Sequence, residues 1–141
     1  TSNAATNYLE RRILDFIFKN NALSFASPGN SLYVGLATAV SAAETGSLTE
    51  ATFTNYARKQ VTAANWTTIG ADSTDTQTAK NAANIEFAAS GGTNNTISHV
   101  FVADASTGGN ILFVGALDVS KLIADGDIFR INTGNLTIEL K

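Results

Sequence analysis

The chain of 141 residues contains no cysteine, no methionine and only one proline. Without cysteine it can form no disulfide, no thiolate metal site and no cysteine nucleophile. The missing methionine leaves the core to Ile, Leu, Val, Phe and Ala, whose shapes define packing closely. Stability must therefore come from packing and strand pairing.

Charge is also scarce, because only 15% of the residues are charged, the net charge is −3, and Lys and Arg form no cluster. Binding to nucleic-acid phosphates needs many cations on one face, so we expect no nucleic-acid partner. No apolar run approaches the roughly 18 residues of a membrane span, and the first residues lack the cationic-then-apolar order of a signal peptide. These absences predict synthesis in the cytoplasm and no membrane partner. Low charge suits a surface covered by neighbouring proteins, and compositional drift explains it equally well.

The residues that usually carry chemistry are few and isolated. His99 is the only histidine and lies in an apolar segment, where a packing role is expected. The sequence around Asp125 and Asp127 lacks the spaced oxygen ligands of a calcium loop, so we predict a turn there. The same prediction applies to residues 72–75. Residues 106–109 lack the lysine and the helix of a phosphate-binding loop. We therefore expect no metal, no cofactor, no small-molecule substrate and no enzymatic activity.

Strand signals dominate the rest of the chain. Residues 97–104 and 111–117 are rich in Val, Ile and Phe and are separated by a Ser/Thr/Gly/Asn cluster, which predicts a β-hairpin. The second of these strands is apolar at almost every position, so we expect other protein against both of its faces. Residues 39–53 and 70–82 show little periodicity and are expected to be loops. Further strands are predicted at 31–38, 55–62, 66–69, 84–88, 121–123, 127–132 and 135–140, the last two as a hairpin.

Short strands with frequent turns and no crossover helices predict an all-β fold. We expect one domain over residues 1–141, a two-sheet antiparallel sandwich of jelly-roll-like or Greek-key type, with one N-terminal amphipathic helix.

That helix is predicted at residues 7–19, because Asn7 and Glu10 have the spacing of a capping box. Leu14 and Phe18 widen its apolar stripe beyond what one sheet face needs. The helix either plugs one end of its own sandwich or offers a second contact surface. The candidate partner-binding residues are Leu14, Phe16, Ile17 and Phe18 of the helix, together with Phe53 and Trp66 of the loops.

Taken in order, several of these segments resemble a family of small tailed-bacteriophage virion proteins, whose members are often labelled tail-fibre proteins and some of which are capsid decoration (cement) proteins. The segments are 8–18, 32–38, 56–61, 84–87, 98–103, 107–113 and 126–140. The resemblance implies a non-enzymatic protein on the capsid surface of the virion that bridges major capsid subunits, with the major capsid protein and copies of itself as partners.

Two other functions compete with capsid decoration. A tail-fibre or adhesin module would bind a host-surface receptor through exposed aromatic side chains near residues 39–53 and 63–82, where Phe53 and Trp66 are the candidates. A carbohydrate-active enzyme would need two carboxylates in one cleft, whereas Glu86 and Asp104 lie on different predicted strands.

Overall fold

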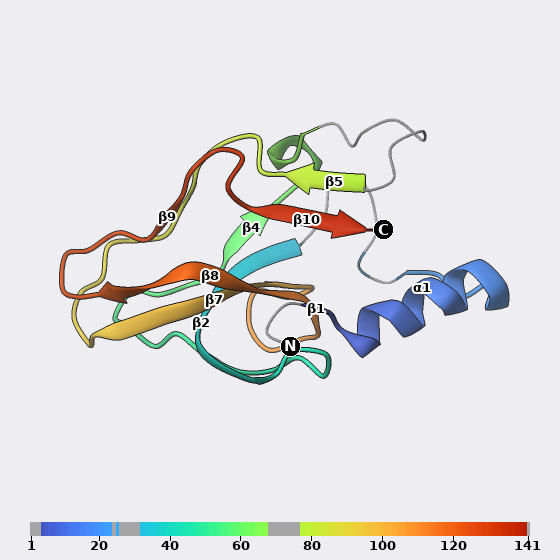
Figure 1. The fold of residues 1–141 in the computed structure, drawn as a ribbon, viewed down its shortest axis with the longest axis horizontal. Helices are drawn as coiled ribbons and strands as arrows, with labels where there is room; N and C mark the ends of the chain where they lie inside the picture. The colour runs from blue at the N-terminus through green and yellow to red at the C-terminus, as the bar shows by residue number, and fades with distance from the viewer. Residues whose placement is uncertain (1–3, 24, 26–31, 68–76, 141) are drawn as a thin grey trace.

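The computed structural model describes residues 4–23, 25, 32–67 and 77–140, and Figure 1 shows their arrangement. These residues form an all-β body with one α-helix near the N-terminus, which confirms the predicted fold class. The strands are β1 (Ala4–Ala5), β2 (Leu32–Ala42), β3 (Ser47–Glu50), β4 (Lys59–Val61), β5 (Gln77–Lys80), β6 (Ile85–Glu86), β7 (Asn95–Ala103), β8 (Ile111–Ile123), β9 (Arg130–Ile131) and β10 (Thr137–Leu140). The helices are α1 (Asn7–Lys19) and the 3-10 turn η1 (Ala63–Asn65).

One antiparallel sheet forms the larger layer, with the strand order β1-β8-β7-β2-β3 and with β4 also paired to β2. The predicted hairpin is confirmed as β7 and β8. β8 is continuous from Ile111 to Ile123, so the separate strand expected at 121–123 is wrong. Between the pairs His99–Ala116 and Ile97–Lys121, residues 117–120 of β8 lie opposite Ser98 alone and form a bulge.

The second layer consists of two ribbons, β5 with β10 and β6 with β9. The predicted hairpin of 127–132 with 135–140 is therefore wrong, because each strand pairs with an earlier part of the chain. Asn81, 1% exposed, links this layer: its Nδ2 donates to the carbonyls of Ala83 (2.9 Å) and Asn132 (3.0 Å), and its Oδ1 accepts from the Leu136 N–H (2.9 Å). Jelly-roll or Greek-key connectivity stays a prediction.

The main core lies between the layers. It joins one face of the large sheet to β6, β9 and the loops beside them. Its buried members are Val34, Leu36, Ala51, Phe53, Val61, Ile85, Phe87, Ile97, Val100, Ile123, Phe129, Ile131 and Leu136.

Two segments expected as loops contain strands. β2 runs on to Ala42 and turns back as β3 through Gly46, whose φ of +71° suits glycine. Residues 39–50 are rich in Ala, Ser and Thr, so their polar and apolar side chains do not alternate clearly enough to mark a strand. β5 likewise occupies 77–80, while 68–76 lie outside the described residues.

Other predicted strands are shorter than expected. Within the strand predicted at 55–62 only β4 is present, and within the strand predicted at 84–88 only β6 is present. Trp66 forms only an isolated bridge with Asn81, and residues 68 and 69 of that predicted strand are not described.

A smaller cluster packs around Phe101 of β7, which is 1% exposed. Gly35 of β2 lies directly opposite Phe101 in the strand register. A Cβ atom on Gly35 would lie 2.6 and 2.7 Å from Cε2 and Cε1 of the ring, so only glycine leaves room for it. The Arg58 guanidinium lies 5.0 Å from the centroid of the same ring. The aromatic ring thus covers the bare backbone of the glycine across the strand pair.

Candidate functional site

Within the part of the chain that the structure describes, α1 is fixed to the β body through the residues around its first turn. Its N-cap is Thr6, one residue before the predicted Asn7, and the Thr6 Oγ1 accepts a hydrogen bond from the Leu9 N–H (3.3 Å). The same hydroxyl donates to the Ile111 carbonyl (2.6 Å), and the Thr6 N–H donates to the Leu112 carbonyl (2.9 Å). Leu9 is 4% exposed and is the one buried residue of α1. From this anchor the helix extends past the end of the sheet (Figure 1).

The second half of α1 carries four large apolar side chains that remain in solvent. We call this set the apolar arm: Leu14 (56% exposed), Phe16 (53%), Ile17 (60%) and Phe18 (74%). The idea that α1 plugs one end of its own body is therefore wrong beyond its first turn. The geometry leaves the arm available as a contact surface.

The two loop aromatics differ from the arm. Phe53 is 2% exposed and packs edge-on against Tyr56, with ring centroids 5.3 Å apart, so its expected place on the surface is wrong. The physical reason is that residues 51–53 lead from the end of β3 into the core. Trp66 is half-buried at the edge of that core.

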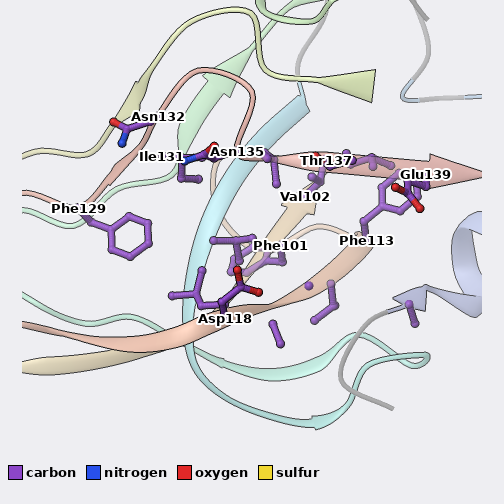
Figure 2. A pocket seen from close by; sticks show the side chains of 18 of the residues that line it. Phe101, Val102, Phe113, Asp118, Phe129, Ile131, Asn132, Asn135, Thr137 and Glu139 are labelled. Atoms are coloured by element: carbon purple, nitrogen blue, oxygen red, sulfur yellow. The ribbon is translucent and has the colours of Figure 1, made fainter. Parts of the chain in front are cut away.

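A groove of about 640 Å³ separates β8 from the segment that contains β9 and β10. Its apolar lining includes Val100, Val102, Phe113, Phe129 and Ile131, and its polar lining includes Asp118, Asn132, Asn135, Thr137 and Glu139. Figure 2 shows Phe113 and Glu139 toward the end near α1, and Phe129 toward the opposite end. Ala4 and Ala5 of β1 also line it. An apolar floor with a few polar groups is typical of a binding surface.

Sequence reasoning missed this groove, although one signal pointed to it. The strand over 111–117 is apolar on both faces, and we expected protein against each face. In the structure Leu112 and Val114 are buried, whereas Phe113 is only half-buried and lines the groove. The second face therefore opens on a partly unfilled space.

The most concentrated ionisable cluster joins Glu50, Tyr56 and Arg58. Arg58 binds both Glu50 oxygens, through Nε to Oε2 (2.8 Å) and Nη2 to Oε1 (2.9 Å), and the Tyr56 hydroxyl donates to Oε2 (2.6 Å). Arg58 Nη1 also donates to the carbonyls of Ala105 (2.7 Å) and Gly108 (2.9 Å) in the β7–β8 turn. The cluster thus ties β3 to the tip of the central hairpin, which is a structural role.

The electrostatics of this cluster agree with that role. Burial alone would raise the pKa of Glu50, but the hydrogen bonds from Arg58 and Tyr56 outweigh it and hold the pKa below the ordinary 4.5. Burial and the bond to Glu50 both raise the pKa of Tyr56. Burial would lower the pKa of Arg58, and the bond and charge of Glu50 raise it above its usual value. All three groups therefore stay in their ordinary charge states near pH 7, with no group prepared for proton transfer.

The remaining polar candidates take up local structural roles. Asp127 Oδ2 accepts from the Ala124 N–H (2.9 Å), which confirms the predicted turn. Asp104 accepts from the Asn110 N–H (2.7 Å) at the hairpin tip, and Glu86 pairs with Arg130 (2.7 Å), so the two carboxylates that an enzyme would need serve separate contacts. His99 Nδ1 lies 2.7 Å from the Ser98 hydroxyl, and burial lowers the pKa of its imidazole.

The described residues hold neither a cluster of metal ligands nor a membrane-spanning helix. No group of three or more His, Asp or Glu side chains within the described ranges could hold a metal ion. Residues 72–75 lie outside those ranges. Neither helix in the described part of the chain is long and apolar enough to cross a bilayer.

Comparison with known proteins places the chain in a family. No curated protein matches the chain. A family model described as "Podophage GP4 fiber I protein gp80" matches residues 4–139, which covers every helix and strand of the body up to the penultimate residue of β10. This agreement confirms the resemblance to small virion proteins of tailed phages, and by it the chain belongs to the family of podophage GP4 fiber I protein gp80.

Proposed function

We propose that this protein is a non-enzymatic structural subunit of a virion fibre and that the apolar arm of α1 joins it to a neighbouring subunit. The fibre assignment is supported by the description of its family. The joining role is carried by one observation: four large apolar side chains, each more than half exposed, lie within five residues of one helix.

Exposure of this size has a free-energy consequence. Full burial of a Leu, Ile or Phe side chain stabilises by about 1.5 to 3 kcal/mol relative to leaving it in water. Side chains that are already about half covered would gain roughly half of this, or about 1 kcal/mol each. Covering the arm therefore supplies several kilocalories per mole, and contiguous apolar surface of this kind marks interfaces.

Capsid decoration is the second candidate, because the same projecting helix on a low-charge β body would also suit contact with a major capsid subunit. The family description favours the fibre. Receptor binding through loop aromatics has less support, since Phe53 is buried and Trp66 half-buried.

Imaging of virions tests the assignment. Virions made without this protein should lack one set of fibres and should keep shells that resist heat as well as those of the parent phage. Missing density on the shell, together with rupture at lower temperature, would contradict the fibre role and favour capsid decoration.

The arm is tested by complementing such virions with Phe18→Ser, which should fail to restore the fibres. Glu10→Gln is the matched control, because Glu10 is exposed on the same helix but lies outside the arm, and it should restore them. Equal restoration by both variants would contradict the role of the arm.

A further inference from the structure

We propose that the groove beside β8 receives the apolar arm of α1 from a second copy of this chain. The proposal deepens the proposed function, because it names the neighbour that the arm contacts. It starts from two surfaces of one molecule: a groove beside β8 whose lining includes half-buried apolar side chains, and a helix whose second half carries four apolar side chains that are each more than half exposed.

The two surfaces match in chemistry, and the groove is long enough for the arm. Phe113, Leu117 and Ile138 line the groove and are only half-buried, so they offer aromatic and aliphatic contacts that the arm's Leu, Ile and Phe side chains complement. The arm covers residues 14–18, about 7 Å of helix, and the stretch from Phe113 to Asp118 along β8 spans about 17 Å, so the arm fits within the groove. An amphipathic helix laid in an apolar groove is a recurrent mode of protein recognition.

Charge complements the apolar match. The groove lining holds two carboxylates, Asp118 and Glu139, and its one cation, Arg130, is already paired with Glu86. The polar side of α1 carries Arg11 and Arg12, each near Asp15 but at 4.0 and 3.8 Å, and Lys19 in its last turn. With Glu10 and Asp15 also on it, α1 has a net charge of +1, and the two carboxylates of the groove lining attract this charge during encounter.

The helix of the same chain is badly placed to fill this groove. β1 lines the groove at Ala4 and Ala5, is paired with Val114 and Phe113, and leads directly into α1. The helix then runs away from the body (Figure 1) and stands beyond the Phe113 end of the groove (Figure 2). Folding the arm back would break the contacts of Thr6 and Leu9 that fix its first turn. A second copy can supply the arm without that loss.

The pairing has a consequence for assembly. Because arm and groove are different surfaces, each bound copy still offers one free arm or one free groove. Contacts of this type are heterologous and build rings or linear arrays. Such an array suits a subunit of a fibre.

The natural absence of cysteine allows a direct test by crosslinking. Lys19→Cys places a thiol beside the arm without removing an arm residue, and Thr137→Cys places one at an exposed groove position. Lys59→Cys, exposed on β4 and outside the groove lining, is the matched control. Under mild oxidation, a mixture of the Lys19→Cys and Thr137→Cys proteins should form the mixed dimer several-fold faster than a mixture of the Lys19→Cys and Lys59→Cys proteins.

Equal rates in the two mixtures would overturn the proposal. A chain that carries both Lys19→Cys and Thr137→Cys tests whether the groove takes the helix of its own chain or that of a second copy. If it closes an internal disulfide at high dilution as readily as the mixture crosslinks, the groove takes the helix of its own chain and the proposal is wrong.

Sedimentation of the intact protein gives a second readout. Phe18→Ser should weaken self-association about tenfold or more, and Glu10→Gln should leave it unchanged. A wild-type protein that stays monomeric at its highest soluble concentration would overturn the proposal.

Failure of this proposal and failure of the fibre assignment are distinguishable. Crosslinking between arm and groove, with the protein found on the shell of the virion, would support the contact and reject the fibre. Fibres that depend on the protein, with no crosslinking between arm and groove, would support the fibre assignment and reject the contact.

Discussion

Gly35→Ala adds one methyl group where the structure has no room for it. The new Cβ would lie 2.6 and 2.7 Å from ring carbons of Phe101, well inside van der Waals contact. The ring cannot retreat easily, because Phe101 is 1% exposed and the Arg58 guanidinium lies over it. Arg58 is itself fixed by hydrogen bonds to Glu50 and to the Ala105 and Gly108 carbonyls. The strand pair must therefore separate, or the ring must leave its position.

Overpacking of this kind costs about 1 to 3 kcal/mol, and alanine returns about 0.4 to 1 kcal/mol by restricting the unfolded chain. We expect a net loss of about 1 to 2 kcal/mol in the free energy of unfolding. In a domain of this size that lowers Tm by about 3 to 6 °C. Urea unfolding followed by the fluorescence of the single tryptophan, Trp66, measures the loss directly.

Gly115→Ala is the matched control, because a Cβ at Gly115 of β8 would have no heavy atom within 4 Å. It should be neutral or slightly stabilising. Phe101→Leu shortens the opposing side chain, so it should cost less in the Gly35→Ala background than in the wild type, with a coupling energy of about 1 kcal/mol. A Gly35→Ala protein as stable as the wild type, or additive costs in the double variant, would refute the packing argument.

Three further predictions concern polar groups and the arm. Asn81→Leu removes the amide that binds three backbone groups, of which the Leu136 N–H is buried, and should lower the free energy of unfolding by about 2 to 4 kcal/mol in urea titrations. The pKa of Glu50 is lowered in the folded state, so its ionised form stabilises the fold above about pH 4.5, and this stability is lost as the pH falls through the lowered pKa. Glu50→Gln should therefore be less stable at pH 7 and lose less stability between pH 5 and pH 3, and parallel acid sensitivity in both proteins would contradict the assignment. Phe18→Ser should change the free energy of unfolding of the monomer by no more than about 0.5 kcal/mol, since Phe18 is 74% exposed, and a large loss in calorimetry would show that the arm packs on its own body.

Local sequence patterns predicted most strands of this fold but not all of their partners. The β7–β8 hairpin was predictable because two apolar runs are joined by a short turn cluster, so the partners are neighbours in the chain. Residues 135–140 alternate clearly and do form a strand, but β10 pairs with β5, which is about 60 residues earlier. Alternation identifies the buried face of a strand and carries no information about the strand beside it.

The candidate surface was predictable to a similar extent. Leu14 and Phe18 stood out because they lie off the main apolar face of α1, and the structure leaves both exposed. Phe53 could not be separated from them, because burial of an aromatic residue in an irregular segment depends on where the chain turns after β3. The groove could not be predicted, because the segments that line it lie far apart in the sequence and meet only when β8 and β10 are in place. These segments are 4–5, 100–102, 113–118, 129–132 and 135–139.

Because few contacts attach α1, the free energy needed to release the helix is much smaller than the free energy needed to unfold the β body. Among the described residues, the helix is held by the two residue pairs of β1, the bonds of Thr6, the bond from the Asn7 N–H to the Glu44 carbonyl (2.7 Å) and the burial of Leu9. Releasing it breaks these few contacts, whereas unfolding the body breaks the whole core, so the helix can detach and return while the β body remains folded. In an assembly joined through α1, the connection between subunits is then the weakest link under mechanical load. Such a fibre yields at its joints and reforms there, and its subunits stay intact.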